Sequence, residues 1–409
     1  MKQDKIVRGL IQDETKRQAR VINLIASENY VSPEVRNALG SVFTNKYAEG
    51  YPKARYYGGN SVVDAVEQLA QMRALELFEL DIKEWSVNVQ PYSGSPANLA
   101  VYTALVPAGE KIMGLELNMG GHLTHGHSVS ATGKFWKQVG YGVDQKTGLL
   151  DYDVLEVLAR RERPKLIVAG YTAYSRIIDF KKFRHIADAL GAIFMVDMSH
   201  FAGLVAGKVY PSPFEYADIV TTTTHKTLRG PRGAVIFSRA KHTRDIDRAV
   251  FPGLQGGPHV NQIAAAAVTF AEASTPQFRK YAAQIVKNAK ALAWGLSQSW
   301  GLPVISGGTD THLFLLNTYA TCAVSGKEAS ELLERADIIV NKNAIPYDER
   351  KPFDPSGIRI GTPAITTRGM CESDMSRIAE FIGRVLAQKQ QPATVKKEVA
   401  AFTRKFPVP

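Results

Sequence analysis

Lys226 lies in the segment Thr221–Gly233, TTTTHKTLRGPRG, which reads as a run of strand-like threonines followed by a short turn bounded by glycine. Lysine is one of the few side chains that can bind an aldehyde cofactor covalently, as it does in pyridoxal phosphate enzymes. Most lysines in loops are solvated surface residues, so the segment alone does not establish a site. The prediction depends on partners elsewhere in the chain.

An acid that could pair with the nitrogen of such a cofactor follows a second predicted strand. The apolar run Ala192–Val196 is typical of a buried parallel strand, and Asp197 ends it. Ligands of open α/β sheets bind at the carboxyl ends of the strands, which is where Asp197 would lie. Taken alone, Asp197 would more readily be interpreted as a helix N-cap. The presence of Lys226 elsewhere in the chain reverses this preference.

A candidate phosphate site follows the predicted strand Trp85–Gln90. The turn Ser93-Gly94-Ser95 leads into a helical pattern that runs to about Leu105, with Pro96 expected at the first helical position. Free N–H groups and hydroxyls at the start of a helix can bind an anion. An ordinary serine N-cap is the alternative.

Longer motifs resemble the serine hydroxymethyltransferase family along nearly the whole chain. They occur in the order of that family: LIASENY (Leu24–Tyr30), TNKYAEGYP (Thr44–Pro52), RYYGG (Arg55–Gly59), NVQP (Asn88–Pro91), GGHLTHG (Gly120–Gly126), TTTTHKT (Thr221–Thr227), FPGLQGGP (Phe251–Pro258) and SGIRIGTPA (Ser356–Ala364). The resemblance implies the aspartate-aminotransferase-like fold, fold-type I of the pyridoxal phosphate enzymes.

The resemblance also implies the residues of a pyridoxal 5′-phosphate site. Lys226 would be the Schiff-base lysine, Asp197 the partner of the pyridine nitrogen and His122 the histidine stacked on the ring. The other cofactor contacts that it implies are Ser93, Gly94, Ser95, Thr172, His200 and His225, with Tyr47 and Gly257 from the neighbouring subunit.

Substrate and folate contacts follow from the same resemblance. Arg359 would hold the substrate carboxylate, for which its forked guanidinium is suited, and Glu49 would handle protons at the substrate hydroxyl. Ser27, Tyr57 and Arg232 would lie close to the substrate, Tyr57 as a further catalytic residue. The implied folate contacts are Glu49, Tyr56, Leu117, Gly121, Leu123, Asn343 and Phe353. Without the resemblance, Glu49 would be a surface residue and Arg359 a structural ion-pair partner.

Several positions depart from the family pattern. The family usually has His and Gln at Tyr92 and Pro96, Ala at Ser199 and Ser at Thr172, and the stretch after Phe237 is more basic than expected. Lys351 replaces a small polar residue in the loop that ends at Phe353. These changes affect the predicted folate site more than the predicted cofactor site.

Three histidines within six residues, His122, His125 and His127, raise the possibility of a metal. No Cys or carboxylate near them in the sequence completes a ligand set, so we predict no metal site.

Composition indicates a soluble cytoplasmic protein. Its 409 residues are 45% hydrophobic, which allows a large core and more than one domain. Two cysteines fit a reducing compartment, and neither a signal peptide nor an apolar run long enough to span a membrane is evident. The formal charge of +11 comes without a basic stripe interleaved with aromatic residues, so we expect no nucleic-acid partner. The positive charge fits a solvated surface, or attraction of an anionic cosubstrate such as polyglutamylated folate.

Predicted strands alternate with helices through the first two thirds of the chain. The strands are expected at Lys111–Leu115, Lys165–Gly170, Ala192–Asp197, Ile219–Thr223 and Ala234–Ser238. This alternation favours an α/β fold with a mainly parallel central sheet. We expect an N-terminal arm at 1–30, a large cofactor domain at 31–276 and a smaller C-terminal α+β domain at 277–409, with short strands at Val304–Ile305, Leu313–Leu316 and Ile338–Asn341.

The function implied is reversible transfer of the hydroxymethyl group of L-serine to tetrahydrofolate, giving glycine and methylenetetrahydrofolate, by a homodimer with shared sites or a tetramer. One alternative is a related pyridoxal phosphate aldol enzyme: a threonine aldolase, a transaldolase or a 2-methylserine hydroxymethyltransferase. Another is a protein of this fold that binds RNA without turnover. Lys226, Asp197 and Arg359 argue against the latter.

Overall fold

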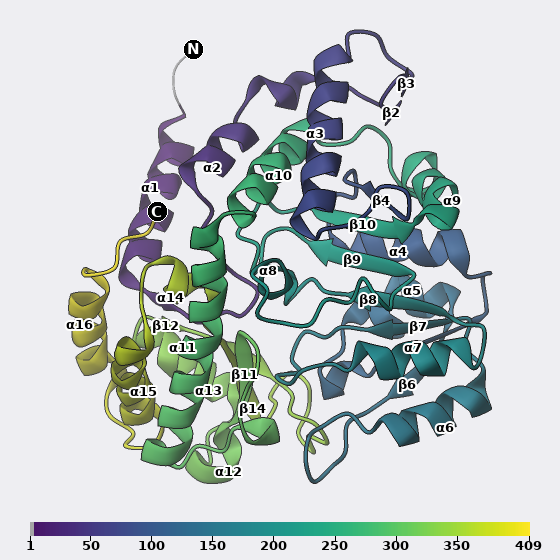
Figure 1. Ribbon diagram of the computed structural model, residues 1–409. Coiled ribbons are helices and arrows are strands. Elements are labelled where there is room, and N and C mark those ends of the chain that lie inside the picture. The colour runs from purple at the N-terminus through teal and green to yellow at the C-terminus, as the bar shows by residue number, and fades with distance from the viewer. Residues whose placement is uncertain (1–3) are drawn as a thin grey trace. The chain divides into compact units, whose positions relative to one another are not determined.

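The computed structural model describes residues 4–409, and its internal contacts divide the chain into two compact units (Figure 1). The large unit is Val31–Ala283. The small unit combines the described residues up to Tyr30 with Gln284–Pro409. The predicted arm at 1–30 therefore belongs to the same unit as the C-terminal part of the chain.

A seven-stranded sheet forms the centre of the large unit. Its order is β4 (Trp85–Asn88), β10 (Ala234–Arg239), β9 (Ile219–Thr223), β8 (Ile193–Asp197), β7 (Leu166–Ala169), β5 (Lys111–Leu115) and β6 (Lys137–Tyr141). The strands from β9 to β6 are parallel, whereas β10 is antiparallel to both of its neighbours. The mainly parallel α/β sheet predicted from the sequence is confirmed.

Side chains alternate between the two faces of this sheet, as the pleat of a strand requires. Met195 of β8 belongs to a buried cluster with Val101 of α4 (Gly94–Leu105), whereas the ring of Phe194 stacks on Phe183 of α7 (Phe180–Asp188) with centroids 5.6 Å apart. Both faces of β8 are therefore buried, which explains why its sequence is continuously apolar rather than alternating.

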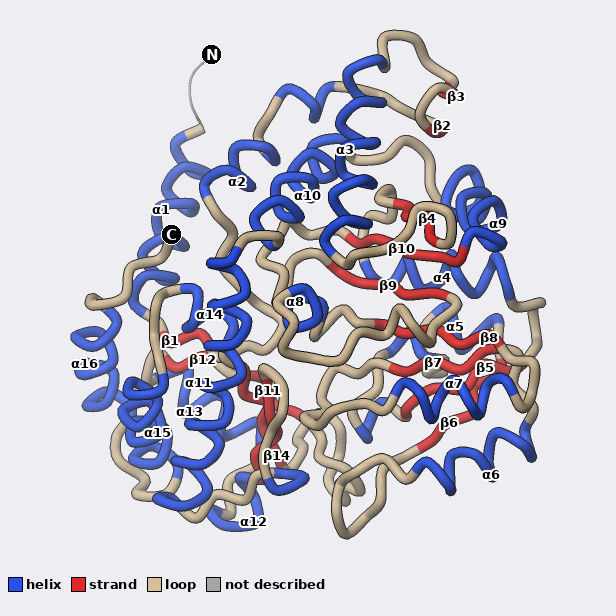
Figure 2. The backbone as a smooth tube through the Cα atoms, viewed as in Figure 1, coloured by secondary structure: helices blue, strands red, loops and turns tan. Residues whose placement is uncertain are grey.

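Helices and short segments complete the large unit (Figure 2). They are α2 (Pro33–Leu39), η1 (Val42–Asn45), β2 (Gly50–Tyr51), β3 (Ala54–Arg55), α3 (Ser61–Leu77), η2 (Leu117–Met119), η3 (Leu123–His125), α5 (Ala131–Phe135), α6 (Tyr152–Glu162), α8 (Ala202–Ala206), η4 (Ala240–His242), α9 (Thr243–Arg248), η5 (Ala249–Leu254) and α10 (Val260–Ala273). The helix α11 (Pro276–Trp300) begins in the large unit and ends in the small one.

The small unit contains an antiparallel sheet of order β11 (Leu313–Asn317), β14 (Gly357–Gly361) and β13 (Asn341–Asn343). A separate parallel pair, β1 (Ile22–Asn23) with β12 (Ile338–Ile339), joins the N-terminal segment to the rest of the small unit. Its other elements are α1 (Lys5–Arg20), η6 (Ile305–Gly307), α12 (Thr318–Cys322), α13 (Gly326–Arg335), α14 (Pro363–Thr367), α15 (Glu372–Leu386) and α16 (Pro392–Thr403). One buried apolar cluster unites these segments.

Three local predictions were wrong, and one strand was missed. The strand expected at Ile338–Asn341 is two short strands, β12 and β13, which belong to different sheets. Val304 forms a single bridge to Leu316, and the residues after it form η6, so no strand occupies Val304–Ile305. The helix α4 begins at Gly94, which makes Pro96 its third residue rather than its first. The strand β6 was not predicted, because its sequence KQVGY is only partly apolar.

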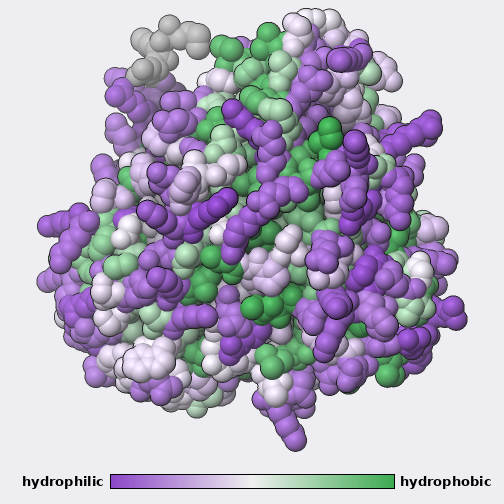
Figure 3. All heavy atoms as spheres, in the orientation of Figure 1, coloured by the Kyte–Doolittle hydropathy of each residue, from purple (hydrophilic) through white to green (hydrophobic). Residues whose placement is uncertain are grey.

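Hydrophilic residues cover most of the face seen in Figure 3, with small hydrophobic patches between them. Within residues 4–409, no helix is long and apolar enough to cross a membrane. The same residues contain no group of three or more His, Cys, Asp or Glu side chains placed to hold a metal ion.

Candidate active site

The carboxyl ends of β8 and β9 bring the two central site residues to one edge of the sheet. Asp197 is the last residue of β8 and pairs in register with Thr221 of β9. Lys226 lies in the bend that follows β9, three residues after Thr223. The parallel pairing of two strands thus explains how residues distant in sequence reach the same place.

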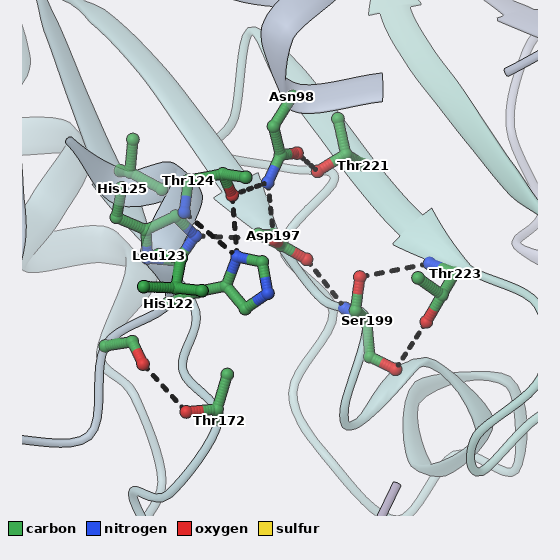
Figure 4. A network of polar contacts seen from close by, with 12 residues as sticks. Asn98, His122, Leu123, Thr124, His125, Thr172, Asp197, Ser199, Thr221 and Thr223 are labelled. Atoms are coloured by element: carbon green, nitrogen blue, oxygen red, sulfur yellow. Dashed lines mark hydrogen bonds and ion pairs between the residues drawn. The ribbon is translucent and has the colours of Figure 1, made fainter. Parts of the chain in front are cut away.

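Asp197 is a buried carboxylate surrounded by hydrogen-bond donors (Figure 4). Its Oδ2 accepts from Asn98 Nδ2 at 2.8 Å and from His125 Nε2 at 3.3 Å, while its Oδ1 accepts from the backbone N–H of Ser199 at 3.1 Å. Burial opposes ionisation, but the hydrogen bond from His125 and the nearby positive charges, including Lys226, hold the pKa of Asp197 well below its usual range. Asp197 is therefore a fixed negative charge.

Two acceptor positions on each carboxylate oxygen make a further contact possible. A carboxylate accepts about four hydrogen bonds in total. Because Oδ1 receives one donor, from Ser199, it can accept a second from a protonated ring nitrogen. The predicted role of Asp197 requires such an acceptor position.

Asn98 of α4 connects Asp197 to the two segments beside it. Its Nδ2 also donates to Thr124 Oγ1 at 2.9 Å, and its Oδ1 accepts from Thr221 Oγ1 at 2.7 Å. Asn98, Thr124 and His125 were not predicted as site residues. The HLTH motif carried a weak signal for the last two, but Asn98 looks like any polar residue within a helix.

His122 lies on the loop after β5 and interacts with the same network. Its Nδ1 is 2.7 Å from Thr124 Oγ1 and accepts from the Thr124 backbone N–H at 3.2 Å. Burial, followed by the charges of His125 and Lys226, lowers the pKa of His122 to about 4. The imidazole is therefore neutral at physiological pH.

The start of α4 forms a candidate anion cradle beside these strand ends. A Cβ atom on Gly94 would lie 2.8 Å from Thr223 Cγ2, so glycine lets the helix begin directly against β9. Ser93 is the N-cap but its side chain makes no capping hydrogen bond, which leaves N–H groups of Gly94 and Ser95 for a ligand.

His225, which precedes Lys226, adds an unpaired polar atom to this region. Its Nδ1 is buried and has no hydrogen-bond partner among residues 4–409. Burial and then the charges of Lys226 and Arg232 lower its pKa to about 3. A buried polar atom without a partner is costly, and a bound ligand would satisfy it.

The loop after β5 holds the predicted folate contacts Leu117, Gly121 and Leu123. Leu117 and Leu123 are partly exposed, at 39% and 42%. A Cβ atom on Gly121 would lie 1.9 Å from the Leu115 carbonyl oxygen, so this position requires glycine. Thr172 Oγ1 donates to the Gly121 carbonyl at 2.7 Å, which ties the loop after β7 to it.

Tyr47, Glu49, Tyr57, Tyr92 and Gly257 form a second group, here called the tyrosine cluster. The Tyr47 hydroxyl donates to Glu49 Oε1 at 3.2 Å, and its ring meets Tyr57 edge-on with centroids 5.0 Å apart. A Cβ atom on Gly257 would lie 3.6 Å from the Tyr47 ring. Tyr47 and Tyr57 are 55% and 48% exposed, and Tyr56 beside them is 76% exposed.

A buried ion pair positions the segment that carries Tyr47 and Glu49. Arg55 Nη2 donates to Glu67 Oε2 at 2.6 Å, and both side chains are almost fully buried. Arg55 Nη1 donates to the carbonyls of Ala48 and Gly50 on either side of Glu49, and Gln90 Nε2 donates to Glu67 Oε1 at 2.8 Å. The backbone around Glu49 is therefore held from both sides.

The small unit contains the remaining predicted residues. Arg359 is the central residue of β14, and its Nε donates to Asn341 Oδ1 at 3.1 Å. Asn343 ends β13 and pairs with Gly357, two residues before Arg359. Gly361 donates through its N–H to the Leu24 carbonyl at 2.8 Å, which brings the segment of Ser27 against the end of β14. Phe353, on the loop before β14, is 83% exposed.

The large-unit residues fit pyridoxal phosphate. A fixed negative charge with a spare acceptor position suits the pyridine nitrogen, the open start of α4 and the unpaired His225 Nδ1 suit the phosphate, and Lys226 adjoins both.

Comparison with known proteins agrees with this arrangement. The family model described as serine hydroxymethyltransferase matches residues 1–382. A serine hydroxymethyltransferase of Desulfotalea psychrophila is 51% identical, with 100% of this chain and 95% of the relative covered. Those of Coprothermobacter proteolyticus and Sorangium cellulosum are each 54% identical, over 97% and 99% of this chain and 95% of each relative.

Full-length similarity at this level confirms the predicted fold class, enzyme class and cofactor, and it confirms tetrahydrofolate as the cosubstrate. Members of the family are generally oligomeric and act on small molecules. The chain belongs to the serine hydroxymethyltransferase family.

Proposed function

We propose that this protein transfers the hydroxymethyl group of L-serine to tetrahydrofolate, reversibly, giving glycine and 5,10-methylenetetrahydrofolate. The observation that carries the proposal is the placement of Lys226 beside the buried carboxylate of Asp197, at the ends of adjacent parallel strands. A fixed negative charge beside a lysine at this edge is what a pyridoxal phosphate enzyme needs. Family membership supplies the reaction.

The cofactor, when bound, supplies an electron sink that stabilises negative charge at the α-carbon of the amino acid. We assign its covalent attachment to Lys226. Asp197 keeps a proton on the pyridine nitrogen, because its negative charge favours the protonated ring. The neutral imidazole of His122 would lie against the ring, and Thr172 and His200 would contact its phenolic oxygen.

The phosphate is held by groups at the start of α4. Ser93, Gly94 and Ser95 would donate to it from the N-cap and the first helical turn, where unpaired N–H groups and the helix dipole favour an anion. His225 donates through Nδ1, which would then be satisfied. Tyr47 and Gly257 complete the cradle from a second subunit.

Arg359 binds the substrate carboxylate, with Ser27, Tyr57 and Arg232 nearby. Glu49 moves a proton at the substrate hydroxyl. This hydroxyl must lose its proton as the bond between the α- and β-carbons breaks. Tyr56, Leu117, Gly121, Leu123, Asn343 and Phe353 contact the folate together with Glu49. Partly exposed apolar side chains such as Leu117 and Leu123 suit the flat pterin ring.

We further propose a homodimer with shared sites. The hydrogen bonds of the tyrosine cluster run to Glu49 and to the Gly257 turn rather than to Asp197 or His122. Aromatic side chains such as Tyr47 and Tyr57 stay half exposed in one chain, which suits residues that complete the site of a partner. A cytoplasmic location fits the two free cysteines, Cys322 and Cys371.

The experiment compares two cleavage reactions of the purified protein loaded with pyridoxal phosphate. Serine cleavage at saturating tetrahydrofolate should be much faster than serine cleavage without it. It should also exceed cleavage of threonine, measured with and without tetrahydrofolate. A threonine rate that is larger and indifferent to tetrahydrofolate would instead identify an aldolase or transaldolase.

A further inference from the structure

We propose that Asn98 is a positioning residue for the charges of this site: through Thr124 it keeps Nδ1 of His122 unprotonated, which places the ring proton on Nε2, and its own amide donates to the Asp197 carboxylate. The inference rests on the proposed function for its catalytic consequence, but the protonation states themselves are properties of the chain. Neither Asn98 nor Thr124 has a part in the function proposed above.

The orientation of the Asn98 amide follows from its three partners (Figure 4). Its Oδ1 accepts from the Thr221 hydroxyl at 2.7 Å, and its Nδ2 lies 2.8 Å from Asp197 Oδ2. The flipped amide would place its oxygen against the carboxylate oxygen, two acceptors in contact. The two N–H groups of Asn98 therefore point to Asp197 and to Thr124.

The Thr124 hydroxyl transmits this orientation to His122. Its oxygen accepts from Asn98 at 2.9 Å, so its single proton is available for His122 Nδ1, 2.7 Å away. The backbone N–H of Thr124 points at the same nitrogen from 3.2 Å. Nδ1 thus receives two donors, which is possible only when it carries no proton, and the ring proton must sit on Nε2.

As a consequence, the bound ring would have a neutral imidazole, His122, on its face and a negative carboxylate, Asp197, at its nitrogen. A cationic imidazole stacked on a cationic pyridine ring would repel it and disfavour its protonation. His125 and Lys226, the other basic groups near His122, and Asp197, the acidic one, are close enough to influence its pKa. With His122 neutral and Asp197 charged, the favourable place for the proton is the pyridine nitrogen.

Ring nitrogen NMR of the full-length protein labelled with ¹⁵N-histidine tests the proposal directly. The chain has nine histidines, and the His122 signals are identified by their loss in His122→Gln. Without cofactor, His122 should show one unprotonated nitrogen, Nδ1, and one protonated nitrogen, Nε2, down to about pH 5. Reading the apoprotein makes the result independent of which reaction the enzyme catalyses.

The matched variants are Thr124→Val and Thr124→Ser. Valine keeps the shape but removes the hydroxyl donor, so the His122 tautomer with its proton on Nδ1 should gain population, whereas serine should preserve the wild-type signals. In the holoprotein, Thr124→Val and Asn98→Asp should each weaken cofactor binding by about tenfold or more, because each disturbs hydrogen bonds to a charged or ring-contacting group. Thr124→Ser should stay within a few-fold of wild type.

Two results would overturn the proposal. One is a wild-type His122 that carries its proton on Nδ1 or is cationic at neutral pH. The other is a Thr124→Val protein, folded by circular dichroism, whose His122 signals match those of the wild type. If the NMR results hold but serine is not cleaved with tetrahydrofolate, the proposed function fails and this inference about protonation stands.

Discussion

The Tyr92 hydroxyl donates a hydrogen bond to the Gly257 carbonyl at 2.8 Å, and the Tyr92 ring stacks on His259 with centroids 4.2 Å apart. This contact joins the residue just before the phosphate-binding turn to a glycine that we assign to the partner's phosphate. Gln255 Oε1 strengthens the link by accepting from the Tyr92 backbone N–H at 3.0 Å. The resemblance to the family predicts histidine at this position, where this chain has Tyr92.

Tyr92→Phe should weaken pyridoxal phosphate binding about fivefold, because it removes one hydrogen bond worth about 1 kcal/mol while keeping the stacked ring. Cofactor dissociation, followed by absorbance, measures the effect. Tyr92→His, which has the usual family residue, is the control and should bind within a few-fold of wild type. An unchanged affinity in Tyr92→Phe would show that the Gly257 turn is held without this bond.

Arg55→Met should destabilise the large unit by about 3–5 kcal/mol, because it leaves the buried carboxylate of Glu67 without its ion-pair partner. Urea unfolding at a fixed protein concentration measures the change. The matched control is Arg160→Met, which breaks the exposed pair with Glu156 on α6 and should cost at most about 1 kcal/mol. Equal losses in the two variants would mean that the buried pair contributes no more than a surface pair.

Glu49→Gln should lower serine cleavage with tetrahydrofolate by about 10²- to 10⁴-fold, because glutamine cannot take up the hydroxyl proton. Cofactor and glycine binding should change little, since the glutamine oxygen can still accept the hydrogen bond from Tyr47, which we assign to the phosphate. Steady-state rates and equilibrium binding separate the two effects. Loss of the cofactor, or normal turnover, would contradict the role assigned to Glu49.

Mixing Lys226→Ala with Tyr47→Ala subunits should restore part of the activity that each variant lacks alone. In a mixed dimer with shared sites, one site carries both substitutions and the other carries neither. Activity is measured after subunit exchange has been verified with differently tagged chains. Sites built from one chain each would show no recovery.

The sequence was sufficient to predict where Asp197 and Lys226 lie, because each is at or just after the end of a strand whose composition is unambiguous. Ile193–Asp197 and Ile219–Thr223 are short, apolar or β-branched runs, and parallel neighbours must present their carboxyl ends together. Lys111–Leu115 was predicted for the same reason and has the predicted bounds.

Asn98 could not be predicted, because its role depends on contacts with residues 26, 99 and 123 positions away. A helix interior gives no local signal for such contacts. The start of α4 was missed by two residues because proline fits any position of the first turn, where N–H groups have no intrahelical partner. Val304 makes only a single bridge, to Leu316. A short apolar pair therefore forms a strand only where it pairs with a neighbouring strand over several residues.

Serine labelled with ¹³C at its hydroxymethyl carbon gives the most direct test of the proposed transfer. With purified enzyme and excess tetrahydrofolate, NMR should find the label in the methylene carbon of methylenetetrahydrofolate, in an amount equal to the glycine formed. The Lys226→Ala variant should form neither product. If glycine accumulates while the label appears as free formaldehyde, at a rate that tetrahydrofolate does not change, the protein is not a hydroxymethyltransferase.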